Sequence, residues 1–258
     1  MNGGGRLRTL VTGAGSGIGL GLAGYLAARG HEVWLSDRAR SDVERAAREL
    51  SQQGHAAHAV ELDVTADRSI RAALESLGEA GVDLLVNNAG LQHVDPLDDF
   101  PPERWALLVA VMLTGPAMVS RALLPGMRRR NFGRIVNVGS IHSLVASPYK
   151  SAYVAAKHGL AGLTKAIALE TADVDVTVNT ICPAYVRTPL VDAQIASQAR
   201  THGIPEQQVI DEIMLKPMPK RAFIGIDELG ALVEYLASDA ARNVTGQSIA
   251  VDGGWTAQ

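Results

Sequence analysis

The sequence predicts one α/β domain, built on a doubly wound parallel sheet of about seven strands with helices on both faces. Short apolar runs alternate with longer helical patterns along all 258 residues. Hydrophobic residues make up 47% of the chain but aromatic residues only 4%, so small aliphatic side chains must fill the core. There is no linker, internal repeat or low-complexity segment, so residues 1–258 are expected to form a single domain.

The first half of this alternation contains strands and helices of ordinary length. Each strand is a short apolar run that ends in polar or glycine residues, and each helix has apolar positions at helical spacing. Ser41 stands where the second helix should begin and is expected to cap it. The predicted strands are Leu7–Thr12, His31–Ser36, Ala57–Leu62 and Asp83–Val86, and the helices are Leu20–Arg29, Ser41–Gln53 and Asp67–Ala80.

The second half continues the pattern with longer helices. Residues 183–216 are polar and irregular with short helical patterns, which suits a small helical lid over a substrate. Asp227 stands at the start of the last helix, where an acidic residue favours the helix dipole. The predicted helices are Pro102–Arg130, Ser151–Ala172 and Ile226–Ser238, and the strands are Phe132–Gly139, Val174–Cys182 and Gln247–Val251.

The turn Thr12–Gly19 is rich in glycine and joins the first strand to the first helix. Its glycines at positions 13, 17 and 19 let backbone N–H groups approach a pyrophosphate. The next strand ends at Asp37, 18 residues beyond Gly19, where a carboxylate can bind the ribose hydroxyls of a dinucleotide. Asp37 also repels a 2′-phosphate and favours NAD, whereas the neighbouring Arg38 could accept that phosphate and leaves NADP open.

Polar residues also follow the third and fourth predicted strands. Asp63 and Val64 offer a carboxylate and a backbone amide to an adenine ring, which is a weak signal by itself. The stretch Asn87–Gly90 places two asparagines at the carboxyl end of a buried strand. Their amides can join neighbouring strands or hold a loop against a cofactor, and for Asn87 the structural and functional interpretations have equal weight.

Tyr153 and Lys157 are four residues apart, which puts both side chains on one face of a helix. A free tyrosine has a pKa of roughly 10, and a nearby ammonium is expected to lower it. The pair therefore predicts acid/base chemistry, with Tyr153 moving a proton and Lys157 tuning it. Ser140 supplies a hydroxyl for the same reacting oxygen. An ordinary amphipathic helix would explain the pair alone, and the preceding motifs favour the catalytic interpretation.

Composition argues against several other classes of function. The formal charge is −3, and the longest cationic run, Arg128–Arg130, falls near a predicted helix end, so nucleic-acid binding is not expected. The single Cys182 excludes an internal disulfide and fits a reducing compartment. No segment is judged apolar enough to span a membrane, and the start Met1–Arg6 lacks a signal-peptide core. A soluble, cytoplasmic protein without a metal site is expected.

The glycine turn, the Asn87–Gly90 stretch and the trio Ser140, Tyr153 and Lys157 occur in the order typical of one family. Together they resemble the short-chain dehydrogenase/reductases over essentially the whole chain. The resemblance implies a Rossmann fold with an NAD cofactor, Tyr153 as the acid/base, Lys157 also on the nicotinamide ribose and Ser140 on the substrate oxygen. It implies that the cofactor is lined by Gly13, Ser16, Gly17, Ile18, Gly19, Asp37, Asp63, Val64, Asn88, Ala89, Gly90, Tyr153, Lys157, Pro183, Val186 and Thr188.

Finer features resemble one branch of this family, the bacterial D-3-hydroxybutyrate dehydrogenases. The matching stretches include Asn87–Val94, Ser140–His142, Lys150–Gly159, Thr188–Val191 and Val251–Trp255. The resemblance implies a substrate carboxylate held by charged and amide side chains, which suits a small 3-hydroxy acid. Without it, Lys150 would read as a solvated loop lysine and His142 as a hydrogen-bonded loop histidine. The implied substrate residues are Gln92, Ser140, His142, Lys150, Tyr153, Tyr185, Gln194 and Trp255.

Two departures from the family pattern leave alternatives open. Met112 stands where most members carry an asparagine that completes the proton relay, and a thioether donates no hydrogen bond. Ala184 and Tyr185 replace the branch's usual glycine and tryptophan. The alternatives are a different small hydroxy acid, sugar or ketone as substrate, or an NAD-binding protein with weakened catalysis. The resemblance also implies a homotetramer, with Pro102–Arg130 and Ser151–Ala172 forming one interface.

Overall fold

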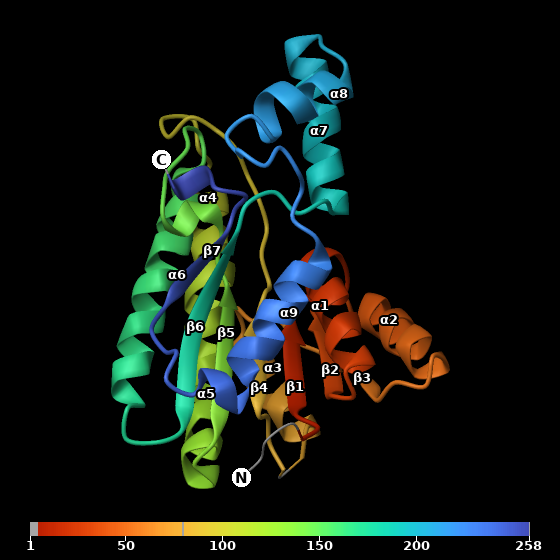
Figure 1. The fold of residues 1–258 in the computed structure, drawn as a ribbon, viewed down its shortest axis with the longest axis vertical. Coiled ribbons are helices and arrows are strands. Elements are labelled where there is room, and N and C mark those ends of the chain that lie inside the picture. Colours follow the sequence, from red (N-terminus) through yellow and green to blue (C-terminus); the bar gives the residue numbers. More distant parts are fainter. Residues whose placement is uncertain (1–4, 79, 258) are drawn as a thin grey trace.

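A seven-stranded parallel sheet forms the centre of the protein (Figure 1). The computed structural model describes residues 5–78 and 80–257. The strand order is β3-β2-β1-β4-β5-β6-β7, so the chain starts in the middle, winds to one edge and then returns to wind to the other. This confirms the predicted doubly wound fold. The predicted features that fall on Met1–Gly4 and Glu79 lie outside the described residues.

Each strand lies where an apolar run predicts it, with small shifts at the ends. All neighbouring strands pair in parallel, and the central strands β4 and β5 are buried along their whole length. Because parallel strands carry connections that cover both faces, their side chains face protein on both sides. The strands are β1 Arg8–Thr12, β2 Glu32–Asp37, β3 Ala57–Glu61, β4 Leu84–Asn87, β5 Gly133–Val138, β6 Val176–Pro183 and β7 Ser248–Val251.

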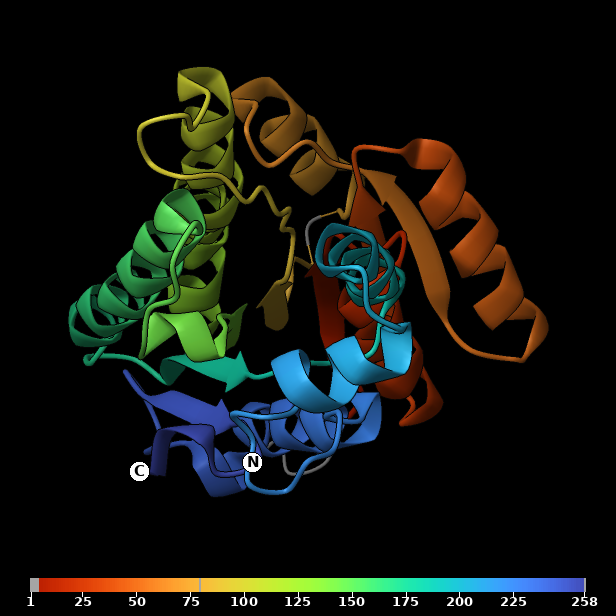
Figure 2. The same cartoon turned by 90° about the horizontal axis from the view of Figure 1, so that it is seen from above.

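Helices cover both faces of the sheet, as seen from above in Figure 2. One apolar cluster joins the sheet to α1 (Gly17–Ala28), α2 (Arg40–Gln52) and α9 (Ile226–Ala237). A second cluster on the opposite face involves α3 (Asp67–Ser76), α5 (Gly115–Arg130) and α6 (Ser151–Glu170). Both clusters consist mainly of alanine, valine, leucine and isoleucine, which agrees with the low aromatic content of the chain.

Helix ends differ from the predictions where backbone geometry decides them. Helix α2 begins at Arg40 after Ala39, so the predicted cap at Ser41 is wrong. The Asp37 carboxylate accepts the Ala39 N–H at 3.2 Å and turns the chain into the helix before Ser41 is reached. Helix α3 ends at Ser76, because Gly78 has a φ of 75°, which a helix cannot continue.

The predicted helix Pro102–Arg130 contains a wide π-helical turn. Helix α4 (Pro102–Val109) passes through the π-helical residues Ala110–Thr114 into α5. The Gly115 N–H donates to the Ala110 carbonyl five residues earlier, which makes the turn wide. Pro116, which has no N–H to donate, follows directly, and the wide turn contains Met112.

The same segment corrects one prediction made from composition. Pro102–Arg130 has a mean hydropathy of 1.8 in its most apolar stretch, so it is long and apolar enough to cross a membrane by length and composition alone. The prediction that no segment qualifies was therefore wrong. The segment is apolar because it packs within the fold, α5 against β5 and α3, and α4 against α6. About 39% of that stretch is buried.

Residues after β6 form a helical lid above the carboxyl ends of the strands (Figure 1). It contains α7 (Pro189–His202), α8 (Glu206–Val209) and the π-helical turn Ile210–Met214, so it is more regular than predicted. An isolated parallel bridge between Val186 and Ile224 closes its base, and the Ile224 N–H donates to the Tyr185 carbonyl at 2.9 Å. The lid is therefore tied together at the point where it leaves and rejoins the domain.

Candidate active site

Two adjoining cavities lie at the carboxyl ends of the strands, beneath the lid. The first has a volume of about 130 Å³ and contains Ser140, Tyr153 and the predicted carboxylate-binding residues in its lining. The second has a volume of about 430 Å³ and is lined by the glycine turn and by residues after β2, β3 and β4. Gln92 lines both cavities, so they meet at this side chain. This edge of a doubly wound sheet is where such folds bind ligands.

The glycine turn requires the absence of side chains at two of its positions. A Cβ on Gly19 would lie 2.3 Å from the Gly13 carbonyl oxygen, and one on Gly13 would lie 2.7 Å from the Ala89 Cα. Gly13 and Gly17 also have φ values of 65° and 58°, which favour glycine. The turn is therefore packed closely against the loop after β4, with its backbone available to a ligand.

Thr12 and Asn88 lock this turn to strand β4. The Thr12 hydroxyl accepts the N–H groups of Asn88 and Ala89 at 3.0 and 3.1 Å. The Asn88 amide donates to the carbonyls of Thr12 and Gly13 at 3.0 and 3.1 Å. Asn87 is buried and donates instead to Asn137 at 2.9 Å, so of the two interpretations weighed for it the structure favours the structural one.

Asp37 lies at the end of β2 and lines the larger cavity. Its carboxylate accepts the Gly15 N–H at 3.3 Å and the Ala39 N–H at 3.2 Å, which fixes it beside the turn. Other predicted cofactor residues share the cavity with it: Gly13, Asp63, Val64, Ala89 and Gly90. Ile18, Pro183, Val186 and Thr188 line the smaller cavity, and Ser16, Gly17 and Gly19 lie in the turn itself. The arrangement fits a nicotinamide dinucleotide extended across both cavities.

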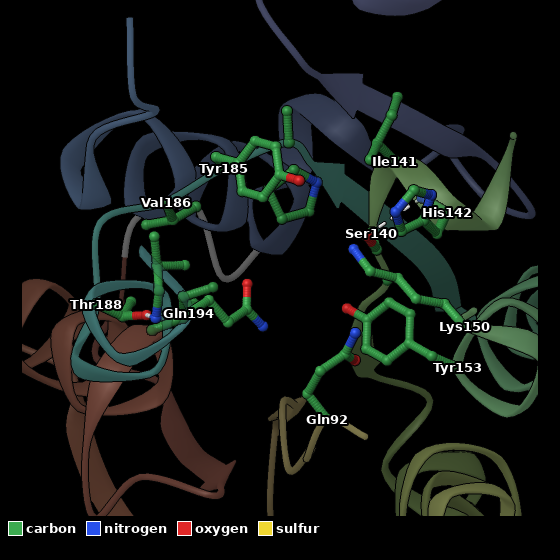
Figure 3. Close-up of a pocket in the computed structure, with 15 residues that line it drawn as sticks. Gln92, Ser140, Ile141, His142, Lys150, Tyr153, Tyr185, Val186, Thr188 and Gln194 are labelled. Atoms are coloured by element: carbon green, nitrogen blue, oxygen red, sulfur yellow. Dashed lines mark hydrogen bonds between the residues drawn. The ribbon is translucent and has the colours of Figure 1, made fainter. Parts of the chain in front are cut away.

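The three predicted catalytic residues come together at the smaller cavity and beneath it. Tyr153 and Lys157 lie on successive turns of α6, and Ser140 follows β5. The Ser140 hydroxyl accepts the His142 N–H at 3.2 Å, and the side chains of Ser140 and Tyr153 face the same space in Figure 3. The Lys157 ammonium donates to the Val138 carbonyl at 2.6 Å and lies 5.7 Å from the centre of the Tyr153 ring.

The expected lowering of the Tyr153 pKa is not found in this structure. Burial raises the pKa of Tyr153, and its interaction with the Ser140 hydroxyl opposes this only in part. Burial also lowers the pKa of Lys157 to about 8. The reason is geometric, because the Lys157 ammonium is bound to the Val138 carbonyl and therefore does little to lower the pKa of the Tyr153 phenol.

Gln92, His142, Lys150 and Gln194 all line the smaller cavity, although they come from four separate segments. Figure 3 shows Gln92 and Lys150 on the side of Tyr153, and Gln194 reaching in from the lid. In the described part of the chain, Gln92 Oε1 and His142 Nδ1 are buried without a hydrogen-bond partner. Buried polar atoms of this kind usually mark a site for a polar ligand or an ordered water.

The charge at this site comes from Lys150 and not from His142. Burial, with a smaller contribution from Lys150, lowers the pKa of His142 to about 4, so the imidazole is neutral near pH 7. His142 therefore offers a ligand a hydrogen bond from a neutral imidazole. Burial lowers the pKa of Lys150 as well.

An aromatic wall closes the cavity on the side of the lid. Tyr185 stacks on Trp255 with ring centres 6.0 Å apart, and His142 meets Trp255 edge-on at 6.2 Å. Trp255 stands behind Tyr185 and does not line the cavity itself. Its turn is held by Asp252, whose carboxylate accepts the N–H groups of Gly254 and Thr256 at 2.9 and 2.8 Å. Burial of Tyr185 raises its pKa, so the phenol stays protonated.

Met112 lies beside Tyr153 as part of an apolar cluster. It is 1% exposed and packs with Leu108, Ala152 and Ala156, against which Tyr153 also lies. A thioether in this position fills space and accepts at most a weak hydrogen bond. The side chain at position 112 therefore adds nothing to a proton relay.

Sequence reasoning missed several residues of the site, among them Thr12 and Arg104. The Thr12 hydroxyl anchors the turn, and its position at a strand end next to the first glycine was the available signal. Arg104 lines the larger cavity from the first turn of α4, far along the chain from Asp37 and Arg38. No local pattern predicts this contact, because it depends on how α4 packs against the strand ends.

Comparisons with known proteins agree with this geometry. The model of the family described as short chain dehydrogenase matches residues 8–199. The chain belongs to the short-chain dehydrogenase family. It is 46% identical over 253 residues to a D-beta-hydroxybutyrate dehydrogenase of Rhizobium meliloti, covering 96% of this chain and 98% of that protein. It is 47% identical over 255 residues to the D-beta-hydroxybutyrate dehydrogenase of Cupriavidus necator, covering 96% and 97%.

Solved structures of this short-chain dehydrogenase fold are also similar. A variant of actinorhodin polyketide ketoreductase with NADPH has a TM-score of 0.92 at 32% identity, covering 99% of both chains. A gluconate 5-dehydrogenase of Burkholderia cenocepacia with NADP and tartrate has a TM-score of 0.88 at 35% identity, covering 98% of this chain and 96% of that one. Family membership implies a nicotinamide cofactor, and these neighbours leave the choice between NAD and NADP open.

The tight packing of the glycine turn gives a first prediction. Gly19→Ala should weaken dinucleotide binding by roughly tenfold or more, because its methyl group would clash with backbone and with the Asn88 amide. Gly24→Ala on the same helix is a matched control, since its Cβ would meet only Leu50 at 3.8 Å. Binding is measured by calorimetry with NAD and NADP. Equal affinity of both variants and the wild type would contradict the assignment of the turn.

The pKa of His142 gives a second prediction. Its folded value of about 4 lies below the ordinary value of 6.5, so the unfolded chain binds the extra proton more readily. The contribution to stability is complete above pH 6.5 and is lost as the pH falls toward 4, by up to about 3 kcal/mol. Urea unfolding at pH 7 and pH 4.5 should show a smaller loss for His142→Gln than for the wild type. An equal loss in both would mean that His142 is not buried in its neutral form.

Proposed function

We propose that the protein is an NAD-dependent oxidoreductase that interconverts D-3-hydroxybutyrate and acetoacetate. The observation that carries the proposal is a cavity of about 130 Å³ with Lys150, His142, Gln92 and Gln194 around it and Tyr153 and Ser140 in its wall. Such a cavity offers a cation and amides to a carboxylate, and hydroxyl groups to a second oxygen. The two D-beta-hydroxybutyrate dehydrogenases that match nearly the full chain support the same substrate.

The substrate carboxylate is assigned to Lys150, Gln92, Gln194 and His142. Lys150 contributes the positive charge, and the two amides and the neutral imidazole contribute hydrogen bonds. Taking a carboxylate out of water is costly unless each oxygen is bonded, so several donors around one small cavity are needed. The unpartnered His142 Nδ1 and Gln92 Oε1 are consistent with a site that is completed by a polar ligand.

The aromatic wall favours a short acid. Tyr185, backed by Trp255, closes the lid side of the cavity, while Val186 and Val191 offer an apolar surface to a methyl group. A longer chain would have to displace the stacked rings. We therefore assign a four-carbon hydroxy acid to this cavity, with its carboxylate toward Lys150 and its hydroxyl toward Tyr153.

In the proposed oxidation, Tyr153 acts as the base in its phenolate form and accepts the proton of the substrate hydroxyl. Ser140 donates a hydrogen bond to the same oxygen and holds it near Tyr153. A bound nicotinamide dinucleotide would supply the acceptor for the hydride that leaves the alcohol carbon. Lys157 is anchored on the Val138 carbonyl, carries its positive charge at pH values below about 8, and does little to lower the pKa of Tyr153 in this structure. In the reduction, Tyr153 returns the proton to the carbonyl oxygen.

The choice of NAD rests on Asp37. Its carboxylate is fixed by two backbone N–H groups and faces the larger cavity, where it would repel a 2′-phosphate. Arg38 and Arg104 line the same cavity and are the residues that could bind that phosphate. We propose NAD because the fixed carboxylate lies directly at the end of β2, the position of ribose recognition in this fold.

Two observations support alternatives to this proposal, one in the choice of substrate and one in the rate of catalysis. The Tyr185 hydroxyl adds a polar group to the cavity wall and favours a more polar substrate of similar size. The apolar surroundings of Met112 favour slower proton exchange, up to an NAD-binding protein with weakened catalysis. Recovery of turnover in Met112→Asn would identify the second case.

We also propose a cytoplasmic homotetramer with no nucleic-acid or membrane partner. About 39% of the most apolar stretch of Pro102–Arg130 is buried within the chain, and Leu169 on α6 is 79% exposed. Large apolar surfaces of this kind are usually covered by a protein partner. The single cysteine, Cys182, is buried and free, which fits a reducing compartment. Light scattering after size-exclusion chromatography measures the assembly.

The direct test of the function is NADH production from D- and L-3-hydroxybutyrate, repeated with NADP. The D acid with NAD should give the highest kcat/KM. Tyr153→Phe should lower kcat by roughly 10²–10⁴-fold, since it removes the proton-transfer group, while Tyr235→Phe, an exposed tyrosine, should leave it unchanged. A Tyr153→Phe variant with wild-type rate would remove Tyr153 from its assigned role.

The carboxylate assignment has a test of its own. Lys150→Ala should raise KM for D-3-hydroxybutyrate by about tenfold or more, because it removes the charged contact. Lys165→Ala, on helix α6 that follows Lys150 but outside the cavity lining, is the matched control. Steady-state kinetics measure both variants at pH 7. If KM for the acid is the same in Lys150→Ala and in the wild type, the carboxylate lies elsewhere.

A further inference from the structure

Two of the residues assigned to the substrate carboxylate stand on loops that are far apart in sequence. Gln92 lies in the segment 91–101, which is part of the connection between β4 and α4, and Lys150 ends the segment 144–150 before α6. Both side chains line the smaller cavity and lie near Tyr153 in Figure 3. Their spacing is therefore set by how these two surface segments are held together.

One backbone hydrogen bond joins the two segments. The Asp95 N–H donates to the Tyr149 carbonyl at 3.0 Å. Asp95 lies three residues after Gln92, and Tyr149 immediately precedes Lys150. Among the hydrogen bonds between described residues, it is the one that connects segments 91–101 and 144–150. Any loss of this bond would let Gln92 and Lys150 move independently.

Tyr149 adopts a backbone conformation that residues other than glycine rarely use. Its φ is 64°, which places it in the left-handed region. This conformation costs roughly 1–2 kcal/mol for a residue with a side chain. Its side chain does not explain the conformation, because Tyr149 is 59% exposed. The observed role of the conformation is to turn the chain so that its carbonyl meets Asp95 while Lys150 enters the first turn of α6.

The partner segment is braced on its own side. The side chains of His93 and Asp95 are paired, and the His93 ring packs edge-on against Phe100 at 5.0 Å. Phe100 is 7% exposed and belongs to the apolar cluster that also contains Leu108 and Ala152. The Asp95 N–H is thus presented from a loop fixed to the core next to α4 and α6.

Lys150 needs such support more than the other residues of the site. A lysine side chain has several rotatable bonds and loses about 2 kcal/mol of rotamer freedom when it is fixed. Lys150 is partly buried, and the lowering of its pKa by burial shows that its ammonium lies away from bulk water. Fixing the backbone immediately before it reduces the freedom that the side chain must lose on binding an anion.

We propose that Tyr149, through its left-handed conformation and its bond to Asp95, is a positioning residue that sets Lys150 against Gln92 for recognition of the substrate carboxylate. The inference rests on the proposed function, since it assigns Lys150 and Gln92 to that carboxylate. Tyr149 itself does not line the cavity. Its effect is therefore on the affinity for the acid group and not on proton or hydride transfer.

A matched pair of variants at position 149 tests the proposal. Both Tyr149→Val and Tyr149→Asn remove the aromatic ring, but asparagine tolerates the left-handed region and a β-branched residue does not. Tyr149→Val should raise KM for D-3-hydroxybutyrate by about tenfold, with kcat and the Kd of NAD within about twofold of the wild type. Tyr149→Asn should keep the wild-type KM. Equal KM values for Tyr149→Val and the wild type would overturn the proposal.

A second pair removes the other partner of the bond. Asp95→Pro deletes the donating N–H, whereas Asp95→Ala keeps it and loses only the pairing with His93. We expect the KM for the acid to rise in the proline variant and to stay within about threefold in the alanine variant. Reduction of 2-pentanone, an uncharged ketone of comparable size, should be equally slow in all variants and the wild type. A parallel change with acid and ketone would overturn the proposal, because it would indicate general damage to the site.

Titration with malonate separates this inference from the proposed function. Calorimetry of the NAD-bound protein should show malonate binding about tenfold weaker to Tyr149→Val than to Tyr149→Asn. This outcome would support the positioning role even if the wild type fails to oxidise D-3-hydroxybutyrate, which would refute the proposed function alone. Equal malonate affinity in the two variants, or no binding to the wild type, would overturn the positioning role.

Discussion

The attachment of helix α6 to the sheet by buried hydrogen bonds is the constraint on which the site depends. Asn137 on β5 donates to Thr164 at 2.8 Å, and Thr164 in turn bonds Thr180 on β6 at 2.7 Å. Asn137 also accepts from Asn87, which extends the network to β4. Unsatisfied polar groups in such a core would be costly, so the network permits one position of the helix along the strands. Tyr153 and Lys157, the residues proposed to be catalytic, lie on this helix and take their position from the network.

Much of the fold could be predicted because it follows from patterns that act locally. Apolar runs of strand length alternating with helical patterns allow few other architectures. The errors lie where a distant or backbone effect decides the outcome. Asp37 bends the chain before Ser41 can cap a helix, and a π-helical turn at Ala110–Thr114 interrupts a segment that reads as one regular helix. The apolar character of that segment reflects packing on two sides, which composition alone does not distinguish from a membrane span.

The sequence was enough to predict most residues of the candidate site, but not their protonation states. Short stretches of sequence are enough to recognise the glycine spacing, the carboxylate at Asp37 and the Tyr153–Lys157 pair. The protonation of those groups depends on burial, which is a property of the assembled fold. Hence His142 is neutral, and the pKa of Tyr153 is raised where the sequence predicted that it is lowered. The roles of Arg104 and the left-handed Tyr149 could not be predicted from the sequence for the same reason, because they depend on tertiary packing.

The closed base of the lid separates two properties of the substrate pocket. Tyr185 lies on the domain side of the Val186–Ile224 bridge, whereas Gln194 lies beyond it on α7. A rotation of the lid about the Val186–Ile224 bridge would move the Gln194 amide away from the cavity. The same rotation would leave the aromatic wall of Tyr185 and Trp255 in place. Changes in the lid helices can thus alter the affinity for the carboxylate of the proposed acid substrate. Changes at the aromatic wall can alter the chain length of the acid that fits. Descendants of this chain could therefore acquire new substrates by altering one of these features at a time.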